Sequence, residues 1–206
     1  MKNIKIKNNI KLAHYANISN DIIYKFKYLN KYEEIEGLHV RRNDLINHKN
    51  NIFKYKFIKN ISIIETSLGL DRFFLLLIDN FLFYEKILLS KYRLVLKIPY
   101  FLSPIKCAIF PLYKNLNIIK LAKKIYLKIK LLYVCIYSDK HSIGKRYRKQ
   151  DAIGTPFCIV IDNNSLKDNK ITIRFRDNMK QKRIYIKEIF KYLKQTKIIN
   201  FLKKIY

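Results

Sequence analysis

The chain has 206 residues, half of them apolar, which is enough to bury one large core or two small ones. Its 43 Lys and Arg residues against 15 Asp and Glu give a formal net charge of +28, which favours a polyanionic partner such as nucleic acid. Residues 2–9 are polar and basic, and the most apolar run, residues 73–83, is too short to cross a bilayer, so we exclude a signal peptide and a membrane partner and expect a cytoplasmic protein.

The first half of the chain predicts an α+β arrangement. Residues 21–26 alternate between apolar and polar side chains, and residues 32–36 lead into Gly37, which predicts an antiparallel strand pair. Residues 61–64 are expected to form a short buried strand, and a strongly apolar helix is expected from Gly69 to about Ser90. Residues 93–97 read as another strand.

Two prolines, Pro99 and Pro104, bracket a short connection that we interpret as a domain boundary, giving domains of residues 1–97 and 98–206. Beyond it, strands and helices alternate, which predicts an α/β sandwich with a mixed sheet. The expected strands are 107–110, 133–137, 157–161 and 171–175, and the expected helices are 117–131, 145–152 and 186–205.

Cysteine and histidine usage gives no sign of a metal site. Cys107, Cys135 and Cys158 lie far apart in apolar runs without a C-x-x-C pair, as buried cysteines do in a reducing compartment. The four histidines have no metal-ligand spacing either. We therefore predict no bound structural metal.

The carboxylates of Glu34 and Glu36 alternate on the second expected strand, so we expect them to share one face. A pair of this kind can bind an ammonium group or a metal ion. A solvated edge strand explains the same pattern.

The segment Ile64–Arg72 reads I-E-T-S-L-G-L-D-R and is expected to join a strand to a helix. Gly69 allows close backbone approach, and Arg72 in the first helical turn can stack on a base or pair with phosphate. Asp71 is equally explained as a favourable charge at the helix N-terminus.

Arginine and tyrosine gather in residues 142–157 and 172–177, whereas most of the positive charge is lysine, in a chain rich in Ile, Asn, Tyr and Phe. AT-rich codons encode these residues, so base composition explains the total charge equally well. Five of the nine arginines lie in residues 146–183, and interleaved Arg and Tyr fit single-stranded RNA. A solvated helix face is the alternative.

Together these segments resemble the glycyl-tRNA synthetase family of the homodimeric class II type. The matching strings, in that family's order, are Lys11–Ala16, Glu34–Gly37, Ile64–Arg72 and Ser142–Cys158, the last beginning S-I-G-K-R-Y. Residues 102–112 also resemble the strand that opens the family's anticodon-binding domain, and residues 172–183 its closing strand and turn. The resemblance extends from about residue 10 to 189 and implies a partial antiparallel catalytic module followed by an α/β anticodon-binding domain.

The resemblance also implies roles for individual residues. Catalysis falls to Arg72, which matches the motif 3 arginine, and to Glu65, which grips the glycine ammonium group with Ser67. Glycine binding is assigned to Glu65, Thr66, Ser67, Leu68 and Gly69, and ATP binding to Glu34, Ile35, Gly69, Leu70, Asp71 and Arg72. ATP would enter as substrate with Mg²⁺, and the reaction would form glycyl-adenylate before transfer to tRNA.

The expected partners are glycine, ATP and a glycine-accepting tRNA. From charge, stacking capacity and position, we expect contact with its anticodon from Arg146, Tyr147, Arg148, Asp151, Thr155, Arg174 and Arg176.

The family's motifs 1 and 2 precede every segment found here, so we expect this chain alone to be inactive. Activity would need a homodimer or a complementary N-terminal fragment. The alternative is a non-catalytic tRNA-binding module or a degenerate, truncated synthetase.

Overall fold

The computed structural model describes residues 3–42, 63–88 and 91–196. Backbone contacts divide the chain into two compact units, residues 1–80 and 81–206, and each is described by itself. The boundary between functional domains at 97/98 stays a prediction. The boundary between the two compact units lies earlier in the chain, at 80/81.

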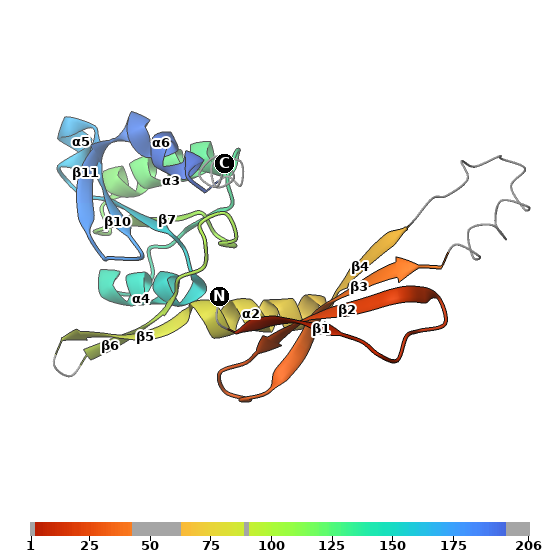
Figure 1. The fold of residues 1–206 in the computed structure, drawn as a ribbon. Helices are drawn as coiled ribbons and strands as arrows, with labels where there is room; N and C mark the ends of the chain where they lie inside the picture. Colours follow the sequence, from red (N-terminus) through yellow and green to blue (C-terminus); the bar gives the residue numbers. More distant parts are fainter. Residues whose placement is uncertain (1–2, 43–62, 89–90, 197–206) are drawn as a thin grey trace, which may run out of the picture. The chain divides into compact units, whose positions relative to one another are not determined.

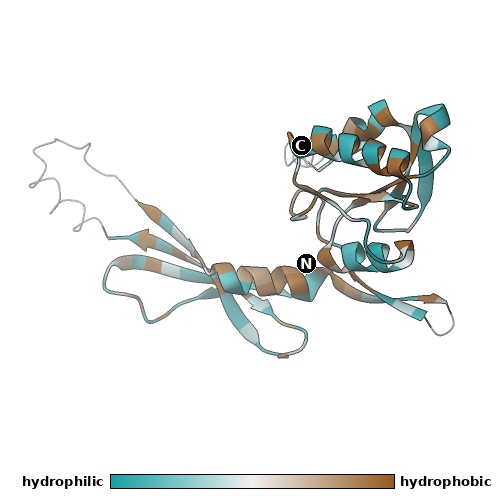
Figure 2. Cartoon of the chain, turned by 180° about the vertical axis from the view of Figure 1, so that it is seen from behind, coloured by the Kyte–Doolittle hydropathy of each residue, from teal (hydrophilic) through white to brown (hydrophobic). Residues whose placement is uncertain are grey.

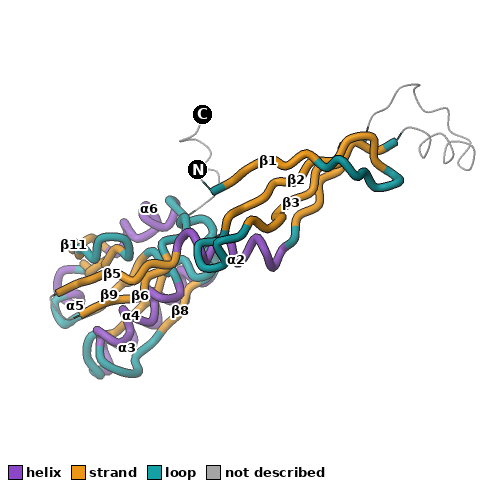
Figure 3. The backbone as a smooth tube through the Cα atoms, turned by 60° about the horizontal axis from the view of Figure 1, so that its bottom comes forward, coloured by secondary structure: helices purple, strands orange, loops and turns teal. Residues whose placement is uncertain are grey.

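The first unit contains a four-stranded antiparallel sheet in the order β1-β2-β3-β4 (Figures 1 and 3). Its strands are β1 (Ile4–Asn8), β2 (Ala16–Lys25), β3 (Tyr32–Arg41) and β4 (Ile64–Leu68). The expected antiparallel pair is present as β2 and β3. Strand β1 was not predicted, because all five of its residues are exposed and it is strongly polar.

The expectation that Glu34 and Glu36 share a face of β3 is wrong. Ile22 pairs with Glu36 and Ile23 with Glu34, so Ile35 is an extra residue that bulges the strand. A bulge reverses the alternation of side chains beyond it. The Glu34 carboxylate therefore lies on the side of Gly37, and Glu36 accepts a hydrogen bond from Thr66 on the other face.

Helix α2 (Leu70–Phe81) follows the sheet and closes a small core of Tyr24, Phe26 and Ile35. The Tyr24 hydroxyl donates to Asp79 Oδ2 at 2.8 Å, which fixes the helix to the sheet. No residue of α2 is buried, although the helix is largely apolar (Figure 2). The helix ends at Phe81 and not near Ser90, because the following residues pair as a strand instead.

That strand, β5 (Leu82–Leu88), forms a hairpin with β6 (Lys91–Leu96), as predicted for the second of them. Residues 82–86 alternate across the two faces of the hairpin, and β6 packs on α4 (Ile143–Ile153). Pairing with β6 decided the structure of these residues where apolar content alone suggested a helix.

The second unit also contains a mixed five-stranded sheet in the order β11-β10-β9-β7-β8. Strand β7 runs parallel to β8 and β9, and β10 runs antiparallel to β9 and β11. The strands are β7 (Cys107–Pro111), β8 (Cys135–Tyr137), β9 (Phe157–Ile161), β10 (Lys170–Phe175) and β11 (Gln181–Tyr185). The predicted α+β fold class, with an antiparallel sheet followed by a mixed α/β sheet, is confirmed.

Helices cover both faces of this sheet (Figure 1). Cys107 and Ile109 of β7 and the odd positions of β9 pack against α3 (Leu116–Lys130) and α6 (Ile189–Lys194). Ala108, Phe110, Cys158 and Val160 pack against α4 through Ile143 and Tyr147. Short α5 (Ser165–Asp168) and the 3₁₀ turn η1 (Ile186–Glu188) complete the unit.

The expected closing helix, residues 186–205, differs from the structure within the described part. Residues 186–188 form η1, and α6 ends at Lys194. Residues 197–206 lie outside the described chain, so the rest of that expectation stays a prediction.

Candidate functional site

In the first unit, Glu65 and Ser67 lie on the face of the sheet that carries Gly37, His39 and Arg41. Register pairs Glu65 with His39 and Ser67 with Gly37. Arg41 binds Oε2 of Glu65 and lies 4.1 Å from the centre of the Tyr15 ring. The other carboxylate oxygen, Oε1, has no partner among the described residues, so Glu65 keeps one open acceptor.

Arg41 is a residue that the sequence analysis missed. Two features of the sequence could have indicated it. Arg is scarce in this lysine-rich chain, and this one stands two residues after His39 on a strand. Only the pairing of β3 with β4 shows that it reaches Glu65.

The strand–helix junction brings several expected ATP-site residues together. The Gly69 N–H donates to the carbonyl of Ile35 at 3.1 Å, and Arg72 Nη1 donates to the carbonyl of Glu34 at 3.0 Å. Ile35 itself is buried in the small core, so its side chain serves packing. Leu68, Leu70, Asp71 and Arg72 are exposed, and Thr66 is engaged with Glu36.

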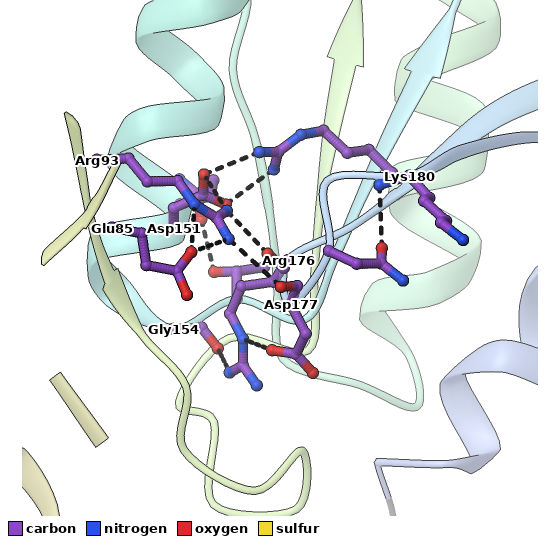
Figure 4. A network of polar contacts seen from close by, with 11 residues as sticks. Glu85, Arg93, Asp151, Gly154, Arg176, Asp177 and Lys180 are labelled. Carbon is purple, nitrogen blue, oxygen red and sulfur yellow. Dashed lines mark hydrogen bonds and ion pairs between the residues drawn. The ribbon is translucent and has the colours of Figure 1, made fainter. Parts of the chain in front are cut away.

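In the second unit, most of the residues expected to touch RNA are buried. The Asp151 carboxylate on α4 accepts hydrogen bonds from Arg174 at 2.8 and 2.9 Å and from Arg93 at 3.1 Å (Figure 4). Arg93 also donates to Glu85 at 2.9 and 2.6 Å and to the carbonyl of Arg176 at 2.8 Å. The Asp151 carboxylate thus links helix α4 to strand β6 of the hairpin and to strand β10.

Arg176 is likewise used inside the unit. Only 2% of it is exposed, and its guanidinium donates to the carbonyls of Gly154 and Ile98, both at 2.8 Å (Figure 4). Thr155 is buried and donates to Gln150 Oε1 at 2.7 Å.

Tyr147 is half-buried, with Arg174 over its ring, and burial raises the pKa of its phenol to about 12. Among the residues expected to touch the anticodon, Arg148 is exposed. RNA contact by the others stays a prediction, and the structure gives their side chains packing and bracing roles.

A groove of about 520 Å³ opens at the carboxyl ends of β7 and β8. Its walls come from the segment after β7, the segment before α4, and the first turn of α4. The lining residues are Pro111, Leu112, Tyr113, Lys114, Asp139, His141, Ser142, Ile143 and Arg146. Carboxyl ends of parallel strands are a common place for ligands in α/β proteins.

Arg146 forms the inner wall of this groove and is 7% exposed. Its Nη1 donates to the carbonyls of Pro111 at 2.8 Å and Ser138 at 3.1 Å, which brace β7 and β8. Its Nε is buried and has no hydrogen-bond partner among the residues that the structure describes. An unpaired buried donor costs free energy, so a ligand acceptor that reached it would be stabilised.

Two further features of the groove leave polar groups open. Ser142, the N-cap of α4, makes no side-chain cap hydrogen bond, so the first N–H groups of the helix lack that partner. His141 has a φ of 69°, a strained conformation for a residue with a side chain. The groove therefore combines open donors with the Asp139 carboxylate, which accepts from the Tyr137 hydroxyl at 3.1 Å through Oδ2.

Both halves of the chain are similar to known proteins. Residues 106–196 match the family described as the anticodon binding domain. The whole chain is similar to glycine–tRNA ligases, with 39% identity to that of Borreliella afzelii over 96% of this chain and 46% of the relative. The ligase of Mycoplasma capricolum is also 39% identical, over 93% of this chain and 43% of the relative. The chain thus spans about half the length of the curated relatives it matches.

Solved structures agree on the fold. The RNA-binding domain of threonyl-tRNA synthetase from Cryptosporidium parvum superposes with a TM-score of 0.64 at 15% identity, over 90% of this chain and 44% of that one. Prolyl-tRNA synthetase from the same organism gives 0.62 at 14% identity, over 94% of this chain and 42% of that one. The expected resemblance is confirmed: over 96% of its length the chain is similar to about half of a glycine–tRNA ligase, and residues 106–196 match the anticodon binding domain family.

The described residues contain neither a membrane-spanning helix nor a cluster of metal ligands. None of the described helices is both long and apolar enough to span a membrane. Within the same residues, no group of three or more His, Cys, Asp or Glu is placed to hold a metal ion.

Proposed function

We propose that this chain acts as the C-terminal portion of a glycine–tRNA ligase, in which residues 98–206 bind the anticodon of a glycine-accepting tRNA and residues 1–97 supply contacts to glycine and ATP. The similarity to ligases over 96% of the chain supports the assignment. The observation that carries the RNA-binding part is the groove at the start of α4, where the buried Arg146 Nε has no hydrogen-bond partner in the described part of the chain.

The groove has the chemistry to hold an unstacked base. Glycine codons begin with two guanosines, so the pairing anticodons contain two cytosines. Cytosine offers an exocyclic amine that a carboxylate accepts, and Asp139 Oδ1 has no other partner among the described residues. Its O2 and N3 acceptors fit the Arg146 Nε–H and the first N–H groups of α4. Tyr113 at the rim is 58% exposed and offers a ring for stacking.

The test compares tRNA transcripts that differ only in the anticodon. We expect the chain to bind a transcript with a glycine anticodon more tightly than one in which both cytosines are replaced. Asp139→Asn should reduce this discrimination by about tenfold, as expected for loss of one base contact. Asp21→Asn, which changes a part-exposed carboxylate of the other unit with no assigned ligand role, is the matched control. Equal binding of all anticodons by the wild-type chain would refute the assignment.

For the ligase reaction, Glu65 and Ser67 would bind the ammonium group of glycine. Oε1 of Glu65 is open while Arg41 holds Oε2, so the carboxylate is fixed in place and still able to accept. Arg72, exposed and anchored on the carbonyl of Glu34, would meet the adenine and phosphates of ATP. Mg²⁺ would accompany the ATP phosphates, with ligands that these residues do not identify.

ATP–pyrophosphate exchange dependent on glycine tests this part. We expect exchange when the chain is combined with a polypeptide that supplies the remaining portion of a related ligase, and its loss in Glu65→Gln. Exchange that stays absent in every such combination would favour the second candidate, a non-catalytic tRNA-binding module. The observation that favours it is the Arg41–Glu65 pair, because the arginine offsets part of the negative charge that Glu65 would present to an ammonium group.

Assembly and location are part of the same proposal. As in class II ligases generally, we expect a homodimer or a complex with a complementary N-terminal fragment, in the cytoplasm. Sedimentation of the chain with and without that fragment measures the assembly directly.

A further inference from the structure

The β5–β6 hairpin has an inner face that packs on the rest of the second unit and an outer face that is exposed. On the fixed face, Arg93 is 3% and Val95 0% exposed. Arg93 reaches Asp151 and Glu85, and Lys97 also pairs with Glu85. The hairpin is therefore held rigidly by its inner face.

The outer face is aromatic and basic. Tyr84 pairs with Leu94 and Lys86 with Tyr92 across the two strands, which places all four side chains on this face. Tyr84 is 72% and Tyr92 47% exposed. Their rings stack with centres 5.4 Å apart and planes inclined by 14°. Neither hydroxyl has a hydrogen-bond partner among the described residues.

The charges of the hairpin are separated between its faces. Glu85 is the only acidic residue in the stretch 82–96, and it lies on the inner face, paired with Arg93 and Lys97. Lys86 is exposed on the outer face, and Lys91 is exposed at the start of β6. The outer face is thus positive, without a neighbouring carboxylate from the hairpin itself.

From this arrangement we infer that the outer face of the hairpin, centred on Tyr84 and Tyr92, is a second RNA-contact surface for the tRNA, outside the matched anticodon-binding residues 106–196. The inference rests on the proposed function for its partner. Exposed tyrosine rings provide a stacking platform for an unpaired base, and the adjacent Lys86 neutralises phosphate. The contact reads no sequence, because stacking and phosphate pairing are open to every base.

A double variant, Tyr84→Ser with Tyr92→Ser, tests the inference in the full chain. We expect it to bind tRNA about tenfold more weakly, as for loss of one stacked base, with the preference for the glycine anticodon unchanged. Tyr28→Ser, which removes a tyrosine that is 65% exposed in the other unit, is the matched control and should bind as the wild type does. Ultraviolet crosslinking should place RNA on the peptide that contains Tyr84 or Tyr92.

The outcomes separate this inference from the proposed function. If wild type and double variant bind every transcript equally tightly, the hairpin surface is refuted even where anticodon discrimination is intact. If the wild type fails to discriminate anticodons but the double variant still loses affinity, the anticodon assignment fails and the hairpin contact stands. A change in sedimentation without a change in RNA affinity would assign the face to a protein partner and overturn the inference.

Discussion

The two units bury their side chains very differently. In the second unit, every residue of β7 and β9 is buried, and helices cover both faces of the sheet. In the first unit, the buried core cluster consists of Tyr24, Phe26 and Ile35, and α2 contributes no buried residue. A charged residue therefore has a different role in each unit. In the second unit it tends to be buried and to join structural elements, whereas in the first unit it is accessible to a ligand.

The largest test of this contrast removes the central brace. Asp151→Ala leaves Arg174 buried without its carboxylate and Arg93 with Glu85 alone, and we expect a loss of about 3–5 kcal/mol in the free energy of unfolding of the second unit. Glu36→Ala in the first unit should cost no more than about 1 kcal/mol, because it lies at a part-exposed pair. Urea unfolding monitored by amide hydrogen exchange, in β7 and β9 for Asp151→Ala and in β2 and β3 for Glu36→Ala, measures both losses, and equal losses would erase the contrast.

Core truncation should separate the units in the same direction. Ile109→Ala in β7 removes a fully buried side chain and should cost about 2–5 kcal/mol. Phe74→Ala in α2, where the ring is 60% exposed, should change stability by about 0.5 kcal/mol or less. A large cost at Phe74, seen by thermal unfolding of the same preparations, would show that α2 is packed more tightly than its exposure indicates.

Two glycines, one in each unit, extend the comparison to the space around the backbone. Gly154 ends α4 with a φ of 87°, and a Cβ there would lie 3.0 Å from the carbonyl oxygen of Leu96. Gly154→Ala should therefore cost about 1–3 kcal/mol through strain and crowding. At Gly69 the nearest atoms would be 3.8 Å away, so Gly69→Ala should be close to neutral. The midpoints of denaturant unfolding decide this, and a neutral Gly154→Ala would contradict the packing of the hairpin on α4.

The smallest expected effect is a pH dependence. Arg183, which donates to Asp162 at 2.8 and 3.2 Å, holds the pKa of that carboxyl below its ordinary value of 3.8. A lowered pKa in the folded state adds stability that is present above pH 3.8 and is lost as the pH falls through the folded value. For this part-exposed pair we expect about 0.5–1 kcal/mol.

Stability measured from pH 6 down to pH 2 should show this loss in the wild type and a smaller one in Arg183→Gln. An identical acid profile in the two proteins would assign the loss to other carboxylates.

The sequence by itself determined much about this protein. Buried strands such as Phe157–Ile161 were placed residue for residue, because an uninterrupted apolar run in an α/β pattern has few other structures. The order of the strings around Ile64–Arg72 and Ser142–Cys158 predicted the similarity to glycine–tRNA ligases, since motif order does not depend on packing. It also located the strand–helix junction where Gly69 and Arg72 meet the β3 backbone.

Tertiary structure decided the rest, through contacts between residues far apart in the chain. An arginine that suits RNA and one that suits a buried carboxylate look alike in sequence, and only the packing of β10 on α4 assigned Arg174 to Asp151, 23 residues away. Pairing with β6 ended α2 at Phe81, and the bulge at Ile35 parted Glu34 from Glu36. Local pattern records what each segment prefers, whereas burial and charge pairing are set by its neighbours in space.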